Sequence, residues 1–584
     1  MAAGDPLMVL PPELVLRILE FTPTSSLASL TTTTKGWHQF IDVTHQEAIY
    51  SVYSKPIRPI GSEDPADTTS FSRYLEGATS SKELCKRQTL LSGNWTSDQP
   101  STTESVLQIG NGPVWRFRPD FKRRFFVSTS QAGGFNVTDM DSGKLLWRLP
   151  STLQRDQDSV RPYAHLEYED GMAVFDREGN ALEVWQTGLD GLRRGEFKRL
   201  AVLPHERQTR GFQLSGGTLC VASTEGEGLV YDMRQQPPRL TRRMVIAEDA
   251  VGHLYQDAGV VMYSMGERGY HFYDKHSGDS LGILKPGPAV SRYHIPHPDR
   301  APEIAQHGST ARPFAPSMPR QAGLVPLTVK NGPLMRDRGS MEAPLAEDEW
   351  GAGALDGKLM VGFSRAGRVY ICPDWRQALQ HEGHYEHSAV IECEYGNTDF
   401  DLGGWLSVRN HRVMFEVRDF IYIVALDDED NVQRLGTGSK IRPSYAYPSY
   451  SASQLAEPVS FMALFDDCVM STHGTLGWRI QDSNITAGDN DSDPDEENAA
   501  EEGPARIFPT KMIRTLSFAP QAEPPRAALW EASSSTPSSS SISRESTRAP
   551  RYSQTELQRV VSLLDEDDGE DRELQALAAL LQLG

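Results

Sequence analysis

Apolar residues recur at helical spacing in three consecutive segments near the start of the chain. Before the first segment, Leu10-Pro11-Pro12-Glu13 suits the first turn of a helix, because proline is tolerated there and an acidic residue complements the helix dipole. The pattern therefore predicts three short helices over residues 8–42, too few to enclose a core of their own. Their apolar positions are Leu14, Ile18 and Phe21; then Leu27 and Leu30; then Trp37, Phe40 and Ile41.

From about residue 105 to 520 the pattern changes to short apolar strands separated by Gly, Asp, Asn and Pro. A repeat unit of two strands joined by a turn occurs four times. The second strand of each unit ends near Asp139, Gln186, Asp232 and Asp274. These positions are 47, 46 and 42 residues apart, close to the ~40–45-residue period of a WD-type propeller blade. Less regular units follow at 358–372, 412–425 and 468–480. The repeats predict an all-β propeller of about seven blades that is similar to WD-repeat proteins.

Residues 286–350 interrupt the repeats with a Pro-, Arg- and His-rich stretch that shows little alternation. The stretch is long enough for an insertion or for one degenerate blade, so an eighth blade stays open. Tryptophans within or beside the strands are expected to belong to the blade cores. They are Trp115, Trp147, Trp185, Trp405 and Trp478.

Length and charge restrict the function further. A chain of 584 residues exceeds the ~250–300 residues at which a single core stops growing, which predicts several domains. The net charge is −21, and residues 489–584 contain 9 basic against 19 acidic residues. This disfavours generic nucleic-acid binding. The five scattered cysteines form no C-x-x-C pair, and the sequence shows no secretory leader or long apolar run. We expect a soluble cytoplasmic and/or nuclear protein without membrane contact.

Two segments have the composition of disordered chain. Residues 484–503 are acidic and poor in apolar residues, and residues 521–584 form a Ser/Pro-rich linker followed by a short amphipathic tail. Ser492, with Asp495 three residues later, is a plausible acid-directed phosphorylation site.

The sequence offers few candidates for catalysis, and we predict no catalytic residue, no cofactor and no metal. His381, His384 and His387 are spaced i, i+3, i+6, which does not place all three on one helix face, and no H-E-x-x-H motif is present. Lys122-Arg123-Arg124 and Arg242-Arg243 are either solvated loop charges or contacts for an acidic or phosphorylated segment.

The N-terminal helices resemble a known family. Leu10-Pro11-x-Glu13-Leu14-x-x-x-Ile18-Leu19, then Ser26-Leu27-x-x-Leu30, then Lys35-Gly36-Trp37-x-x-Phe40 is similar to the F-box pattern. Lys82–Arg87 and Asn94-Trp95 are similar to the connecting helix and Asn-Trp pair of F-box/WD-repeat proteins. Thr31–Thr34 and Gly36 depart from the F-box pattern and lower helix propensity.

The resemblance implies a non-catalytic substrate receptor of an SCF ubiquitin ligase. Its F-box would bind the Skp adaptor, and through it the cullin scaffold, while the propeller would bind an unknown protein client. The resemblance assigns nine residues to adaptor contact or to the F-box core without separating the two roles. They are Leu10, Pro11, Leu14, Ile18, Leu19, Leu27, Leu30, Trp37 and Phe40.

These expectations divide the chain into an F-box at 5–45, a helical and polar linker at 46–97, a propeller at 98–520, and the tail at 521–584. Two other functions stay open. One is a ligand-binding or enzymatic propeller with an N-terminal helical cap, which requires His, Asp or Glu residues to converge at one mouth of the propeller. The other is an F-box scaffold that acts outside ubiquitin transfer.

Overall fold

The computed structural model separates into two compact units. The helical unit comprises the described residues within 5–103, 465–468 and 517–520, and the β unit comprises the described residues within 104–464 and 469–516. The residues described are 5–53, 70–97, 100–154, 158–246, 253–286, 291–295, 320–321, 325–326, 348–380, 387–393, 405–417, 420–432, 444–451, 455, 457–478 and 507–520. Among these residues, no helix is both long and apolar enough to cross a membrane.

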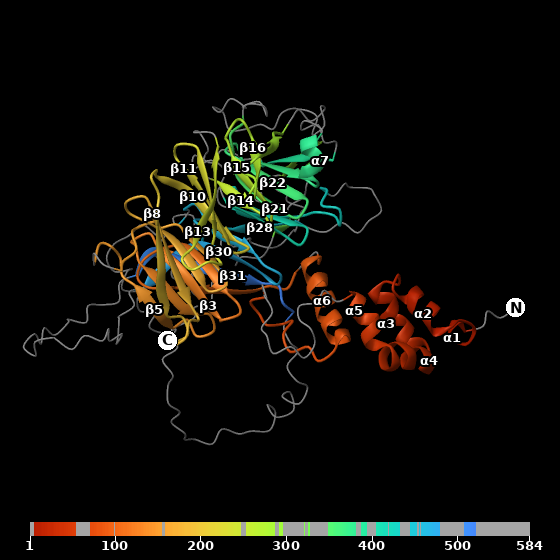
Figure 1. Cartoon of the computed structure of the whole chain (residues 1–584). Helices are drawn as coiled ribbons and strands as arrows, with labels where there is room; N and C mark the ends of the chain where they lie inside the picture. The colour runs from red at the N-terminus through yellow and green to blue at the C-terminus, as the bar shows by residue number, and fades with distance from the viewer. Residues whose placement is uncertain are drawn as a thin grey trace, which may run out of the picture. The chain divides into compact units, whose positions relative to one another are not determined.

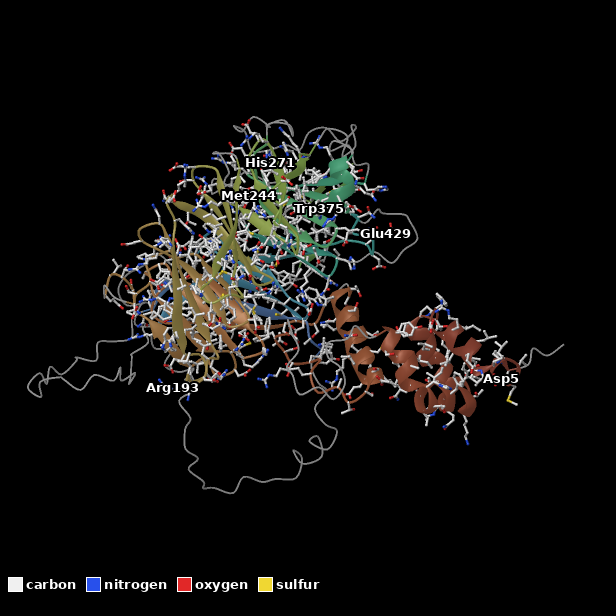
Figure 2. The ribbon with its side chains drawn as sticks, in the orientation of Figure 1. Asp5, Arg193, Met244, His271, Trp375 and Glu429 are labelled. Atoms are coloured by element: carbon white, nitrogen blue, oxygen red, sulfur yellow. The ribbon has the colours of Figure 1, made fainter. Side chains whose placement is uncertain are left out.

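The helical unit contains six α-helices and one π-helical turn among its described residues, coloured red to orange in Figure 1. The elements are α1 (Pro6–Val9), α2 (Pro12–Leu19), α3 (Thr24–Thr33), α4 (Lys35–His38), η1 (Gln39–Thr44), α5 (Gln46–Tyr53) and α6 (Ser81–Trp95). Asp5, labelled in Figure 2, begins α1 by accepting a hydrogen bond from the Leu7 amide at 3.1 Å. The predicted third helix consists of α4 and η1, and the Thr34 hydroxyl caps α4 by accepting from the Trp37 amide at 3.2 Å.

These helices share one apolar core with α6. Val15, Leu19, Leu27, Ile41, Ile49, Tyr50 and Cys85 form its buried centre. The N-terminal helices thus do have a core within this chain. The sequence pattern did not predict it, because α5 and α6 supply the residues that the first three helices lack.

The end of α6 is fixed by its Asn-Trp pair. The Trp95 ring stacks on Phe518, with ring centroids 3.6 Å apart and planes inclined by 12°. Its indole N–H donates to the Asp466 carbonyl at 3.0 Å. The Asn94 amide donates to the carbonyls of Phe518 at 2.6 Å and Ser101 at 2.7 Å. Asn94 and Trp95 therefore join three distant chain segments within the helical unit.

The β unit is a propeller of seven sheets. Its inner strands contact one another in the order β2, β6, β10, β14, β21, β25 and β29. The first four sheets run in chain order as follows: β2 (Val114–Asp120), β3 (Phe125–Ser130), β4 (Phe135–Asp139), β5 (Leu145–Leu149); β6 (Leu166–Glu169), β7 (Met172–Arg177), β8 (Ala181–Thr187), β9 (Phe197–Pro204); β10 (Thr209–Ser215), β11 (Thr218–Ser223), β12 (Glu227–Asp232), β13 (Arg239–Val245); β14 (Leu254–Gln256), β15 (Val260–Ser264), β16 (Tyr270–Asp274), β17 (Ser280–Leu284).

The fifth and sixth sheets receive edge strands from the insertion at 286–350. The fifth contains β21 (Trp350–Asp356), β22 (Leu359–Ser364), β23 (Arg368–Cys372), β24 (Ala389–Cys393), β18 (Ser291–Ile295) and β20 (Val325–Pro326), and α7 (Trp375–Gln380) follows β23. The sixth contains β25 (Leu406–Arg409), β26 (Arg412–Val417), β27 (Phe420–Ala425), β28 (Tyr445–Pro448) and β19 (Arg320–Gln321). Within its described residues the insertion extends existing blades and forms no eighth sheet.

The seventh sheet closes the ring with strands from both ends of the propeller sequence. Its order is β1 (Thr103–Leu107), β31 (Ile507–Ser517), β30 (Cys468–Trp478) and β29 (Met462–Leu464). Glu104 on β1 and Arg514 on β31 form an ion pair at 2.8 Å, and the Arg514 side chain is 1% exposed. The predicted two-strand unit at 468–480 is wrong, because 468–478 form one continuous strand whose partner comes from residues 507–517.

Aromatic and sulfur-containing side chains fill the spaces between the blades. Met244 and Trp375, both labelled in Figure 2, belong to two of these cores. Trp185 is buried and Trp147 packs against the same core, as predicted. Trp115 and Trp405 differ from the prediction, since both are half-buried and lie against the Arg116 guanidinium.

Candidate functional site

Helix α2 exposes a row of apolar side chains. Leu14 is 53% exposed, Ile18 is 54% exposed and Phe21, just beyond the helix end, is 74% exposed. The neighbouring row of Val15 and Leu19 is buried at 2% and 1%. Both rows follow helical spacing, so α2 is apolar on two faces while the core of its own unit covers only one.

Helix α1 contacts α2 and enlarges this surface. Its Met8 is 85% exposed and its Val9 is 68% exposed. We name Met8, Val9, Leu14, Ile18 and Phe21 the α1–α2 apolar surface. Scattered apolar residues on a surface need no explanation, but five within fourteen residues indicate a binding surface.

The structure assigns the nine predicted F-box residues to different environments. Leu14 and Ile18 are exposed, and Pro11, which precedes the first residue of α2, is exposed as well. Leu19 and Leu27 are buried in the core. The remaining four, which are half-buried and pack against that core, are Leu10, Leu30, Trp37 and Phe40.

Sequence reasoning missed other residues on both faces. Val15 repeats with Leu19 at i, i+4, and this signal in the sequence would have separated the buried row from the exposed one. Met8 and Val9 precede the start signal at Leu10-Pro11-Pro12-Glu13 and were not assigned to a surface. Ile49 and Tyr50 follow the motif, and only the fold places them in its core.

The two basic clusters are largely paired within the chain. The Arg123 guanidinium lies 2.9 Å from the Asp120 carboxylate, and Arg124 lies 2.5 Å from Asp141. Arg243 pairs with Glu227 at 2.8 Å. This supports the interpretation of these clusters as structural surface charges rather than as contacts for an acidic client.

A second group of polar residues converges at the inner strands of the propeller. The Arg118 guanidinium lies 2.6 Å from the Glu167 carboxylate, and the His165 ring lies 2.9 Å from the same carboxylate oxygen. Burial opposes the ionisation of Glu167, but Arg118 and His165 outweigh it, so the pKa of Glu167 lies below its ordinary value. Burial and the nearby Arg116 lower the pKa of His165. The sequence signal was Arg116 and Arg118, which alternate around the buried Phe117.

The predicted histidine cluster lies mostly outside the described residues, which include His387 but neither His381 nor His384. Across the described part of the chain, no group of three or more His, Cys, Asp or Glu side chains is arranged to hold a metal ion. The acidic segment 484–503 and the tail 521–584 also lie outside the described residues.

Comparison with known proteins gives no family assignment. No family model and no curated protein sequence matches the chain. Among solved structures, the computationally designed protein Ika8 is 15% identical, with a TM-score of 0.37, over 63% of this chain and 96% of that one. U3-55K is 9% identical, with a TM-score of 0.36, over 63% of this chain and 90% of that one.

Proposed function

We propose that this protein is the substrate-recognition subunit of a cullin-based SCF ubiquitin ligase. In this proposal the helical unit binds a Skp adaptor and the propeller holds a protein client. The protein itself performs no chemical step. The observation that carries the proposal is the exposure of Leu14, Ile18 and Phe21 on the segment whose sequence resembles the F-box.

The physical basis of adaptor binding is the burial of apolar surface. Leu14 and Ile18 are more than half exposed in the chain alone, so a partner that covers them removes this apolar area from water. Each Å² of apolar surface buried in this way contributes roughly 25 cal/mol. The ridge formed by side chains at i, i+4 and i+7 is the form in which a helix presents anchors to an apolar groove.

The physical basis of client turnover is proximity. A client held on the propeller places its lysines at high effective concentration near a ubiquitin thioester that the cullin carries. This accelerates transfer without a catalytic group on the receptor. The cluster of Arg118, His165 and Glu167 fits binding better than catalysis, because the Glu167 carboxylate is already paired with Arg118 and within hydrogen-bond distance of His165.

Affinity purification of the full chain from cells tests the proposal. The double variant Leu14→Ala/Ile18→Ala should lose the Skp adaptor and the cullin together. If each truncation costs ~1–2 kcal/mol of interface energy, the combined loss of affinity is roughly 30- to 700-fold.

The matched control is Val52→Ala/Leu90→Ala. Val52 on α5 is 55% exposed and Leu90 on α6 is 47% exposed, so the control removes similar apolar area outside the F-box-like segment. Adaptor recovery at the wild-type level with the Leu14/Ile18 variant would refute adaptor binding by this surface. Adaptor binding without ubiquitin transfer to any bound client would favour a scaffold outside ubiquitin transfer.

A further inference from the structure

Arg116 is a half-buried cation without an ion-pair partner among the described residues. It lies on β2, and its guanidinium carbon is 4.0 Å from the ring centroid of Trp405 and 5.8 Å from that of Trp115. Its Nε is shielded from solvent and has no acceptor, and the described residues provide neither a hydrogen bond nor an ion pair to its side chain. The cost of burying a charge is normally offset by a partner.

The neighbouring charges do not supply that partner because they are paired with one another. Arg118 binds Glu167, and Arg161 binds Asp176. Burial, together with the repulsion from Arg118, lowers the pKa of Arg116 to about 9. The cluster therefore carries one cation in excess, and that cation is Arg116.

The aromatic rings around Arg116 come from different blades. Trp115 is on the first sheet, whereas Trp405 directly precedes β25 of the sixth sheet. Phe461 precedes β29 of the intervening seventh sheet and stacks under the Arg118 guanidinium at 4.0 Å. The contact between Arg116 and Trp405 therefore joins the inner strand of the first sheet to the residue that precedes the inner strand of the sixth.

Tyr163 adds an exposed aromatic ring to this cluster. It is 52% exposed and packs edge-on against Trp115, with ring centroids 5.2 Å apart. Its backbone φ is 55°, a conformation that a bulky residue rarely adopts and that is often retained at binding sites. An exposed, strained tyrosine beside a counterion-free arginine indicates a site that is completed by a ligand.

We propose that four residues bind an Asp or Glu side chain of a client peptide, rather than a phosphorylated residue, together with an adjacent apolar or aromatic residue. The four are Arg116, Trp115, Tyr163 and Trp405. This proposal specifies the client class and rests on the propeller half of the proposed function. One planar guanidinium matches one carboxylate in charge and in its two-pronged geometry. A phosphate dianion would leave one negative charge uncompensated at this site. The exposed rings provide the apolar contact area for the neighbouring residue.

The test uses the full chain and immobilised peptide pools that are degenerate except for one central position, fixed as Asp, Glu, Asn, Gln or phosphoserine. Wild type should retain the Asp and Glu pools about tenfold better than the Asn and Gln pools, as expected for a charge-assisted hydrogen bond. Arg116→Met should abolish this preference. Arg243→Met, which removes an arginine that is paired with Glu227, is the matched control and should keep it.

Thermal denaturation separates a binding role from a structural one. Arg116→Met removes a half-buried charge that lacks an ion-pair partner, so its melting temperature should equal or exceed that of wild type. Tyr163→Ala, at an exposed position, should fold normally and bind every pool several-fold more weakly while keeping the acidic preference. An Arg116→Met variant with a lower melting temperature and a uniform loss of all pools would overturn the proposal in favour of a structural role.

Two further outcomes would also overturn the proposal. One is equal retention of acidic and amide pools by wild type, and the other is retention of the phosphoserine pool above both acidic pools in an Arg116-dependent manner. Adaptor recovery is measured in the same preparations. If wild type still recovers the adaptor but does not prefer the acidic peptide pools, only this binding site is rejected. If wild type prefers the acidic pools but does not recover the adaptor, only the ubiquitin-ligase role is rejected.

Discussion

Two leucines of α2, Leu14 and Leu19, have opposite roles, although the sequence presents them as equivalent positions. Leu19 is 1% exposed and Leu14 is 53% exposed. Leu19→Ala should lower the unfolding free energy of the helical unit by ~2–5 kcal/mol, and Leu14→Ala should change it by less than about 0.5 kcal/mol. Denaturant unfolding of the two full-length variants, followed by circular dichroism at a helical wavelength, measures both values. Equal destabilisation by the two substitutions would contradict the assignment of the buried row.

His473 should make the stability of the propeller depend on pH. It is 1% exposed on β30, and burial together with Arg514 lowers its pKa well below the ordinary value. Below the unfolded-state pKa of ~6.5, the unfolded chain binds a proton that the folded chain does not accept, so stability falls with decreasing pH. From pH 7 to pH 5, wild type should lose more stability than His473→Leu, by up to about 2 kcal/mol. Thermal or denaturant unfolding at the two pH values measures this difference, and parallel losses in both proteins would refute it.

The residue-level prediction from sequence was limited by the double periodicity of α2. Leu14, Ile18 and Phe21 satisfy helical spacing, and so do Val15 and Leu19. Which row is buried depends on where α5 and α6 pack, so it is set by the tertiary structure and not by the local sequence. Arg116 illustrates the same limit, since its lack of a counterion depends on residues from several blades.

Among the elements, β31 is the strand on which closure of the ring depends. It lies between β1 and β30, so it joins the N-terminal edge of the propeller to its last blade. Deleting residues 505–520 should expose both neighbouring strand edges and abolish a cooperative unfolding transition of the propeller. The control is deletion of residues 532–543, a somewhat shorter Ser/Pro-rich segment. Differential scanning calorimetry of the two deletions tests this, and an unchanged melting temperature without 505–520 would show that another strand closes the ring.

Element prediction succeeded where the repeat was regular. The first four blades follow the 47-, 46- and 42-residue spacing, and their central strands β3, β7, β11 and β15 lie at the predicted positions. It failed at β30, because a turn was expected where eleven residues continue as one strand. The strand β18, which lies between β20 and β24, was also not predicted. It pairs in parallel with β24, nearly one hundred residues later, and short-range alternation carries no information about such a pairing.

At the scale of the whole molecule, the uneven charge predicts competition between an acidic segment and an acidic client. Residues 489–502 lie outside the described part of the chain and contain eight acidic residues and no basic one. If this segment competes for the excess positive charge at Arg116, deleting it should increase retention of the Asp and Glu peptide pools at low salt. Replacing its Asp and Glu residues by Asn and Gln should have the same effect, because the competing interaction is electrostatic.

Measuring peptide retention at low and high salt distinguishes this electrostatic competition from a steric effect of the segment. Electrostatic competition is screened over a Debye length of ~10 Å at 0.1 M salt and ~3 Å at 1 M, so the gain from the deletion should shrink as salt rises. If the segment acts sterically, the gain from the deletion would persist at high salt, and the Asn/Gln variant, whose length is unchanged, would show no gain. Phosphorylation at Ser492 would add negative charge and should lower retention further at low salt. Equal retention by wild type, deletion and Asn/Gln variant at low ionic strength would leave the segment without a role in client binding.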